Sequence, residues 1–464
     1  MINRVKQLLS TRNILLLILL FAAASRLWRL NLPANYYFDE VYHVVTVRLI
    51  AQNDPRAYEW WHSAPEPDTA IDWLHPPLAK LTQAASIIIL GNNGGFGWRF
   101  SSAVFGIGVI ALTYALARKL NFSPAVGLLA AGLASLDGLL LAMSRITMND
   151  IHITFFFLLT MWLYLHWRAK PSAKRLILVG LAAGAAAASK WSGVFVVLPI
   201  MADQLIWWIK NRVQTKKVEW RRTLQIILAL GILMPLVYLL SYSQMFWQGH
   251  DWQHFKELHQ QIWWYQTNLT ATHPYQSTPL EWLLNYRPVY TYTNNPGDGL
   301  MQNMYIQGNH ILLWGGLAAV LWTASSFLVW LGSWLQASLN MIETKSKHAQ
   351  AKQRAELTEL KNNFKVAGPL IFLLISYLST WIVWTNSPRI MFFYHYTPAL
   401  PFLFVLLSYW LIELYKVSKL GKYLSLSFVG LAVLTFVIFY PNWTGLPVNA
   451  ELFSKIFFLL PSWR

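Results

Sequence analysis

The first 27 residues, "MINRVKQLLSTRNILLLILLFAAASRL", start with a basic segment (Met1–Arg12) and continue into an apolar run from Asn13 to Leu27. This order of charge and hydrophobicity is also typical of a secretory signal peptide. A signal peptide would end at a small-residue cleavage site followed by a soluble domain, and neither follows this segment. The segment therefore predicts a retained first membrane helix, and the fold of a membrane protein.

The rest of the chain repeats the apolar pattern. Of its 464 residues, 55% are hydrophobic and 12% are charged. An apolar run of about 18–20 residues is long enough to cross the hydrocarbon core of a bilayer. We predict an all-α polytopic membrane protein with about eleven spans, or ten if 176–209 is one long broken helix. The spans are 13–30, 98–117, 123–143, 148–167, 176–189, 191–209, 223–243, 309–335, 367–385, 395–415 and 424–441.

The positions of lysine and arginine test this arrangement. With the N-terminus in the cytoplasm, the segments on the inner side hold 24 of the 37 lysines and arginines. Cytoplasmic loops of membrane proteins are enriched in these residues, so the pattern supports a cytoplasmic N-terminus and an extracytoplasmic C-terminus. The net charge of +17 then reflects membrane orientation, and no nucleic-acid partner is expected. The inner segment 336–366 is interpreted as a charged helical connector.

Three regions lie on the outer side: 31–97, 244–308 and 441–464. We divide the chain into an N-terminal catalytic transmembrane module (1–243), a second outer loop (244–308) and a C-terminal transmembrane module (309–464). Within the second loop, 252–263 has apolar residues near helical spacing and predicts an amphipathic helix in the membrane interface. Because the polar residues gather on the outer side, a soluble cytoplasmic nucleotide sugar could not reach them, and no glycine-rich phosphate loop is found.

Asp39 and Glu40 are adjacent in "YYFDEVYH", residues 36–43. On a helix, neighbours diverge by about 100°, so the two carboxylates cannot form a matched pair facing one substrate. One can face a reaction centre while the other contacts the protein or an acceptor. The alternative is a structural role, in which Asp39 or Asn35 caps a short helix that runs to Ile50.

The motif "IDWLHPPLAK", residues 71–80, places Asp72, His75 and Lys80 around two prolines. A helix starting near Pro77 would offer free N–H groups to an anion, and Lys80 would add a positive charge in its first turn. This predicts a phosphate site at the membrane surface. The alternative is that Lys80 only extends toward the interface and His75 only satisfies a turn.

Four further ionisable residues lie at outer ends of predicted spans. They are Arg99 in "GWRFSSAVFG", Arg145 and Asp150 in "SRITMNDIH", and Lys190 in "AAASKWSG". Ionisable groups this close to a membrane core are costly unless paired, and so are functional candidates. The alternative for Arg145 and Asp150 is a structural ion pair.

The sequence gives little indication of a metal centre or a redox group. There is no cysteine, which excludes disulfides, thiolate metal sites and cysteine nucleophiles. His250 and His254 are four residues apart, near His259 and His273, a spacing that can hold a metal on a helix. We interpret them as interfacial histidines among tryptophans. No cofactor is assigned, although a divalent cation is not excluded.

Taken together, the motifs resemble those of the protein O-mannosyltransferases, glycosyltransferase family 39. "YYFDEVYH", "HPPLAK", "WRFSSAVFG" and "SRITMND" resemble its N-terminal half. The second outer loop adds "HQQIWWYQTNLTATHPYQSTPLEWLLNYRPV" and "IQGNHILLW", and "SPRIMFFYHYTPALPF" resembles a C-terminal transmembrane segment. The motifs occur in the family's order over nearly the whole chain. The short second loop leaves no room for the MIR domain of eukaryotic members, so the chain is similar to prokaryotic ones.

This resemblance implies a GT-C membrane glycosyltransferase that uses a polyprenyl-phosphate-linked sugar, mannose in most members, and a Ser/Thr-containing protein acceptor. It further implies an inverting transfer. Asp39 would be the base, with Glu40 assisting or binding the acceptor. Arg99 and Lys80 would bind the donor phosphate together with His75, and Arg145, Asp150 and Arg389 are secondary candidates. The active site would lie on the extracytoplasmic face of the plasma membrane. An oligomeric state is not specified.

Two other functions are compatible with the same pattern. A related GT-C enzyme would glycosylate a lipid or a cell-envelope polysaccharide. A lipid flippase or transporter would line a path with charges, but such proteins place ionisable groups near the membrane midplane. Here Asp137 is the clearest mid-span charge, and it can also simply end a helix.

Overall fold

The computed structural model describes residues 10–92, 94–215, 220–343 and 367–464. Each of the eleven apolar runs lies on helical structure in this part of the chain. Nine correspond to single helices or to a helix with a short 3-10 extension. These are α2 (Thr11–Leu27), α5 (Gly95–Lys119), α8 (Asp150–Ala169), α9 (Ala173–Ser189), α11 (Trp220–Ser241), α15 (His310–Glu343), a helix over 367–381 followed by η3 (Ile382–Asn386), η4 (Phe393–Ala399) with α17 (Leu400–Val417), and α18 (Lys419–Thr444).

A tenth run, 191–209, is also one helix with a 3-10 start, η2 (Trp191–Val196) followed directly by α10 (Val197–Thr215). Among the eleven runs, 123–143 is the one interrupted within the described residues. Residues 123–143 form α6 (Pro124–Ser135) and α7 (Gly138–Met143), and the Asp137 carboxylate between them accepts a hydrogen bond from the Leu140 amide at 2.8 Å. Asp137 thus starts helix α7, whereas the structural alternative expected it to end a helix. The segment 176–209 is not continuous either. α9 ends before Lys190, and η2 leads into α10.

Not all of these helices are long and apolar enough to cross a membrane. By length and composition, seven helical segments of the described chain can cross a membrane: Gly95–Lys119, Trp191–Ile209, Trp220–Ser241, His310–Ser333, Ala367–Asn386, Phe393–Val417 and Lys419–Thr444. Among the others, α2 and α9 have 17 residues each and α6 has 12. The predicted number of eleven spans therefore stays a prediction.

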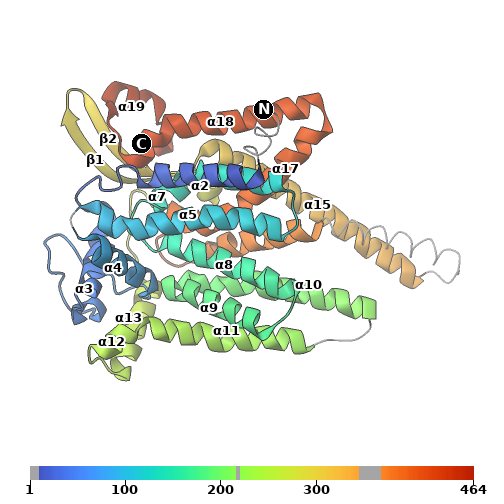
Figure 1. Ribbon diagram of the computed structural model, residues 1–464, viewed down its shortest axis with the longest axis horizontal. Coiled ribbons are helices and arrows are strands. Elements are labelled where there is room, and N and C mark those ends of the chain that lie inside the picture. The colour runs from blue at the N-terminus through green and yellow to red at the C-terminus, as the bar shows by residue number, and fades with distance from the viewer. Residues whose placement is uncertain (1–9, 93, 216–219, 344–366) are drawn as a thin grey trace.

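The long helices lie roughly side by side in one bundle (Figure 1). Helix α9 packs between α8 and α11, and α5 packs on α6 and α8. Small residues permit the closest of these contacts. A Cβ on Gly180 or Gly184 would lie 2.5 Å from Leu233 or 2.6 Å from Val237 of α11. Glycines four residues apart let two helix backbones approach closely, as in other membrane bundles.

The short elements gather at one end of the bundle, on the left of Figure 1. They include α3 (Glu40–Ala51), η1 (Pro55–Tyr58), α4 (Leu78–Leu90), α12 (Ser243–Trp247), α13 (Trp252–Asn268), α14 (Pro279–Leu283), α19 (Ala450–Ile456) and η5 (Pro461–Trp463). Helix α13 is the amphipathic helix predicted over 252–263. It buries Leu258 and Ile262 in an apolar cluster shared with α3 and α4, and leaves Trp252 and Trp263 more than half exposed.

A small antiparallel sheet was not predicted. Strands β1 (Val289–Gly297) and β2 (Leu300–Ile306) form a hairpin in the second outer loop, with Val289 opposite Ile306, and β3 (Val448–Asn449) pairs with the start of β2. The segment "VYTYT" is rich in β-branched and aromatic residues, and "NNPGDG" supplies the turn. The sheet ties the C-terminal tail to the second outer loop, while the chain remains mostly helical.

Candidate active site

Asp39 lies at the start of α3, at the end of the bundle where the short elements gather. It occupies the N-cap position, but its side chain makes no capping hydrogen bond. Its carboxyl is partly buried and has His43, Asp72, Asp150 and Lys190 as charged or titratable neighbours. Burial is the main cause that raises the pKa of Asp39 to about 6. The structural alternative, a cap formed by the Asp39 side chain, is therefore not what this structure shows.

Glu40 has a different environment from its neighbour. It is completely buried, and Arg99 of α5 binds both of its carboxylate oxygens, Nε to Oε1 at 2.8 Å and Nη2 to Oε2 at 2.7 Å. The other Arg99 N–H groups donate to the carbonyl oxygens of Leu30, Pro33 and Asn35. A guanidinium has five N–H donors, and all five are used here. Arg99 therefore has no free donor for a phosphate, contrary to the expectation from the motif.

Lys80 is also fully engaged. Its Nζ lies 2.9 Å from Oδ2 of Asp72 and donates to the backbone carbonyls of Asp72 and His75. Only 2% of the residue is exposed. An ammonium has three N–H groups, and three oxygens surround this one. The helix start near Pro77 is confirmed, since α4 begins at Leu78 with Pro77 as its N-cap, but Lys80 points its charge at Asp72.

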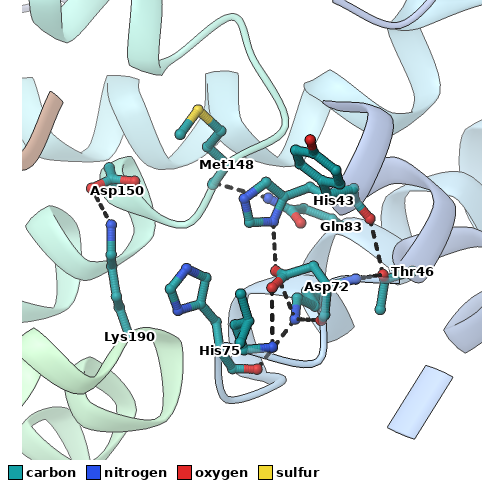
Figure 2. A network of polar contacts seen from close by, with 11 residues as sticks. His43, Thr46, Asp72, His75, Gln83, Met148, Asp150 and Lys190 are labelled. Atoms are coloured by element: carbon teal, nitrogen blue, oxygen red, sulfur yellow. Dashed lines mark hydrogen bonds and ion pairs between the residues drawn. The ribbon is translucent and has the colours of Figure 1, made fainter. Parts of the chain in front are cut away.

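The Lys80–Asp72 pair extends to two histidines (Figure 2). Nδ1 of His43 lies 2.9 Å from Oδ2 of Asp72, and the His43 and His75 rings stack with centroids 6.0 Å apart. Burial alone would raise the pKa of Asp72, but Lys80 and His43 outweigh it and hold the pKa well below its usual value. Burial lowers the pKa of His75, so its imidazole is neutral at pH 7. His43 is four residues after Asp39, so the two share a face of α3.

Asp150 and Lys190 form the second ion pair of Figure 2, with 2.8 Å between Oδ1 and Nζ. Asp150 is the first residue of α8, and Lys190 lies in the break between α9 and η2. The Lys190 ammonium also lies 5.5 Å from the ring centre of Tyr394. In the described structure it donates one hydrogen bond, to Asp150, which leaves two of its three N–H groups. Lys190 is thus the cation beside Asp39 with capacity for an anion.

The segment after Lys190 is held by hydrogen bonds from two other elements. Nε1 of Trp191 donates to the Tyr238 hydroxyl of α11 at 2.8 Å, and that hydroxyl lies 2.8 Å from Nε2 of His259 in α13. Nδ1 of His259 lies 2.7 Å from the Phe255 carbonyl, which can only accept, so this nitrogen carries the proton. Each hydrogen bond then has one donor and one acceptor, from Trp191 to Tyr238 and from Tyr238 to His259. These bonds fix Trp191, the residue that follows Lys190.

Arg145 serves the end of another helix. Its guanidinium donates to four backbone carbonyls around the C-terminus of α2, those of Ser25, Arg26, Trp28 and Arg29. A cation at a helix C-terminus satisfies carbonyls that lack helical partners and complements the helix dipole. The predicted alternative of an Arg145–Asp150 ion pair is wrong, since Asp150 pairs with Lys190.

Arg389 lies on the other side of the Asp39 region, in the segment before η4. It donates from Nη1 to Gln266 of α13, and it lines a cavity of about 650 Å³ together with 269–278. Its charge reaches the side chains of Tyr394 and His395. Tyr394 also neighbours Asp39. Arg389 and Lys190 are thus both close to Tyr394.

The histidines of the second outer loop have protein partners. His250 lies 2.9 Å from Glu59, His254 contacts the Tyr58 carbonyl, and His259 belongs to the row described above. Within the described residues no group of three or more His, Asp or Glu side chains is placed to hold a metal ion.

The arrangement combines a basic carboxylate with a cation that can stabilise a developing negative charge. Asp39, Asp150 and Lys190 come from different elements, and the structure brings them together with His75. Arg99 and Glu40 pair with each other, Arg145 binds backbone carbonyls at the end of α2, and Arg389 lines the adjoining cavity. Two neighbours, His43 and Tyr394, were not singled out from the sequence. The i, i+4 spacing of Asp39 and His43 was the available signal for the first, and no local signal marks Tyr394.

Comparison with known proteins identifies the family of the chain. The family described as "Dolichyl-phosphate-mannose-protein mannosyltransferase" matches residues 75–258, and the "C-terminal four TMM region of protein-O-mannosyltransferase" matches residues 251–463. The polyprenol-phosphate-mannose–protein mannosyltransferase of Mycobacterium tuberculosis is 25% identical over 454 residues, covering 84% of this chain and 81% of that protein.

Solved structures share the fold. The S. cerevisiae protein O-mannosyltransferase Pmt1-Pmt2 complex bound to the sugar donor superposes with a TM-score of 0.79 at 16% identity, covering 98% of this chain and 93% of the yeast chain. ArnT from Cupriavidus metallidurans superposes with a TM-score of 0.55 at 14% identity, covering 96% and 64%. These likenesses confirm the GT-C fold of an integral membrane protein. The chain belongs to the protein O-mannosyltransferases, glycosyltransferase family 39.

Proposed function

We propose that this enzyme transfers mannose from a polyprenyl-phosphate donor to serine and threonine hydroxyls of proteins outside the cytoplasm. The observation that carries the proposal is the setting of Asp39. Its carboxyl forms no ion pair within the described residues, has a pKa of about 6, and lies near Lys190, which keeps free N–H groups. The family and the names of the relatives supply the class of donor and acceptor.

Asp39 is the general base of the proposed reaction. Its carboxylate takes the proton of the acceptor hydroxyl as the hydroxyl oxygen bonds to the anomeric carbon of mannose. The bond between this carbon and the phosphate oxygen breaks on the opposite face, and polyprenyl phosphate leaves with the electron pair. A base is most effective when its pKa is close to the working pH, and a pKa raised to about 6 meets that condition.

Lys190 is the residue we propose to bind the donor phosphate. A positioned cation stabilises the charge that develops on the leaving phosphate, and it needs no reorganisation if it is already held. Asp150 holds Lys190 from one side, and the fixed position of Trp191 restrains the backbone that follows it. His75 lies between this pair and Asp72 and is a second, neutral phosphate contact (Figure 2).

The remaining predicted site residues act by holding other residues in place. Arg99 holds Glu40 and thereby the first turn of α3, so that the adjacent Asp39 has a defined direction. Lys80 holds Asp72 and His75. Arg145 joins the α7–α8 loop to the end of α2. We place this end of the bundle on the extracytoplasmic face of the plasma membrane, where the distribution of lysine and arginine along the sequence puts it.

The purified enzyme in lipid provides the test. Polyprenyl-phosphate mannose labelled in the sugar is supplied with a peptide that contains one serine, and the matched control peptide has alanine at that position. Label on the serine peptide and absence of label on the alanine peptide are the expected result. Label that appears on a lipid or a polysaccharide but on neither peptide would exclude a protein acceptor.

A further inference from the structure

The cavity beside Arg389 is large and is formed by two separate parts of the chain. It has a volume of about 650 Å³, within the range of roughly 300–1,000 Å³ typical of ligand sites. One wall is 269–278 with Glu281 and Arg287, and the other is 388–391. The proposed mechanism uses neither wall.

Direct hydrogen bonds hold these walls in place. The Ser277 amide donates to the Met391 carbonyl at 2.9 Å, which joins the two walls. Nε of Arg287 donates to the Pro274 carbonyl at 2.8 Å, and Nε1 of Trp282 donates to the Ser277 hydroxyl at 2.9 Å. The cavity is therefore a formed feature of the fold.

A short row of rings connects the cavity to the base. His273 lines the cavity, and its ring centre lies 5.2 Å from that of Phe392. The Phe392 ring in turn lies 6.4 Å from Phe38, the residue before Asp39. The Phe392 and Phe38 rings thus link the lining of the cavity to the residue that precedes Asp39.

The lining is suited to a polypeptide more than to a lipid chain. It mixes four hydroxyl side chains and one amide with charged and apolar residues, and a polypeptide offers partners for all of these whereas a polyprenyl chain offers only apolar contacts. The backbone of 270–272 has no regular structure, and its amides donate no hydrogen bond within the described residues. An extended peptide can pair with such a segment through its own backbone.

The charges of the lining favour an acidic peptide. Arg287 and Arg389 each donate a hydrogen bond from one guanidinium nitrogen to a protein oxygen. Both residues also line the cavity. The single lining carboxylate, Glu281, is occupied by the amide and the hydroxyl of Thr278. The uncompensated charge of the cavity is therefore positive.

We infer that this cavity binds the protein acceptor as an extended segment, and that it prefers segments with an aspartate or glutamate close to the target serine or threonine. The inference rests on the proposed function, because it names where and how the acceptor of that reaction is bound. The bound segment extends from the cavity past the Phe392 and Phe38 rings, so that its serine or threonine hydroxyl reaches Asp39, while the flanking acidic residue meets Arg287.

Two variants test the site, each compared with the wild-type enzyme in lipid. Ala271→Trp fills the cavity from an exposed loop position, and Leu280→Trp adds the same side chain at an exposed position of α14 outside the lining. Ala271→Trp should raise the KM for the peptide at least about tenfold and leave the KM for polyprenyl-phosphate mannose within about twofold. Leu280→Trp should change neither.

Arg287→Gln tests the charge preference, since glutamine still offers a donor to the Pro274 carbonyl. Wild type should have a KM about two- to fivefold lower for a serine peptide with a neighbouring aspartate than for the asparagine peptide, and Arg287→Gln should remove this difference. Thermal unfolding of each variant verifies folding.

Three results would overturn the inference. The first is an unchanged peptide KM in Ala271→Trp. The second is a raised donor KM in that variant, which would make the cavity a lipid-phosphate site. The third is a wild-type enzyme without an acidic preference. A wild-type enzyme that transfers to no peptide would instead contradict the proposed function itself.

Discussion

Arg99 and Glu40 form a closed pair inside the end of the bundle that holds α3 and α4, with Nε–Oε1 and Nη2–Oε2 distances of 2.8 and 2.7 Å. Neither residue is exposed. The amide of Thr147, in the loop before α8, donates to the same Oε1 at 3.1 Å. Three parts of the chain thus meet at the Glu40 carboxylate. Its neighbour Asp39 is left outside this contact, and that difference divides the two acids into a supporting and a reacting residue.

Glu40→Gln should destabilise the protein strongly. It leaves the Arg99 guanidinium buried without its counter-charge, which costs about 3–5 kcal/mol in comparable buried pairs. Thermal unfolding in lipid measures the loss. The matched control is Glu451→Gln, which removes an exposed pair with Lys455 and should change stability by less than about 1 kcal/mol. Equal, small effects of both substitutions would show that the Arg99–Glu40 pair does not hold this end of the bundle together.

Lys190→Ala should weaken donor binding. The substitution removes the cation that we assign to the leaving phosphate, so we expect both a higher KM for polyprenyl-phosphate mannose and a lower kcat, with kcat/KM reduced about 10²- to 10³-fold. The KM for the peptide should change little. Lys190→Arg keeps the charge and should recover part of the activity. Steady-state kinetics with both substrates provide the measurement, and an unchanged donor KM in Lys190→Ala would refute this role.

The rate of transfer should fall in acid because of Asp39. Its pKa is raised to about 6, and only the ionised carboxylate accepts a proton, so activity is retained above that pH and lost below it. The decline should approach about tenfold per pH unit. Initial rates are measured between about pH 4.5 and 8, a range that brackets the transition. Each rate is corrected for hydrolysis of the donor without enzyme. A constant rate across the interval would exclude Asp39 as the titrating base.

Arg145→Met should lower stability without a selective effect on either substrate. The substitution leaves the carbonyls of Arg26 and Trp28 without the donor that holds each at 2.8 Å. A buried group that loses its partner costs about 1–3 kcal/mol. Thermal unfolding and kinetics on the surviving folded fraction distinguish this role. A raised donor KM in a protein of normal stability would instead make Arg145 a phosphate contact.

Much of the helical architecture follows from hydrophobicity. Apolar runs such as 98–117 and 424–441 lie within α5 and α18, because length and composition suffice to specify such helices. Local capping chemistry is readable in part: α4 starts next to Pro77 as expected, whereas Asp137 begins α7 and was expected to end a helix. The β1–β2 hairpin was not predicted, although "VYTYT" and "NNPGDG" are strand and turn signals. The expectation that all structure here was helical outweighed them.

The site was predicted in its residue types more than in its pairings. The motifs single out Asp39, Glu40, Lys80 and Arg99 correctly as residues of one region. They do not reveal that three of the four charges are already paired, Glu40 with Arg99 and Lys80 with Asp72, because such pairs join residues 59 and 8 positions apart. Lys190 was noted only as the charge at a helix break. Its place beside Asp39 depends on how α3, α8 and α9 pack.

The assignment of Asp39 as the base is tested most directly by one comparison in lipid. Asp39→Asn keeps the size and polarity of the side chain, removes its ability to accept a proton, and breaks no ion pair of the described structure. We expect unfolding temperature and donor affinity close to wild type, and a loss of kcat for mannosyl transfer to a serine peptide of at least about 10²-fold. Transfer by Asp39→Asn at a rate near that of wild type would contradict the account.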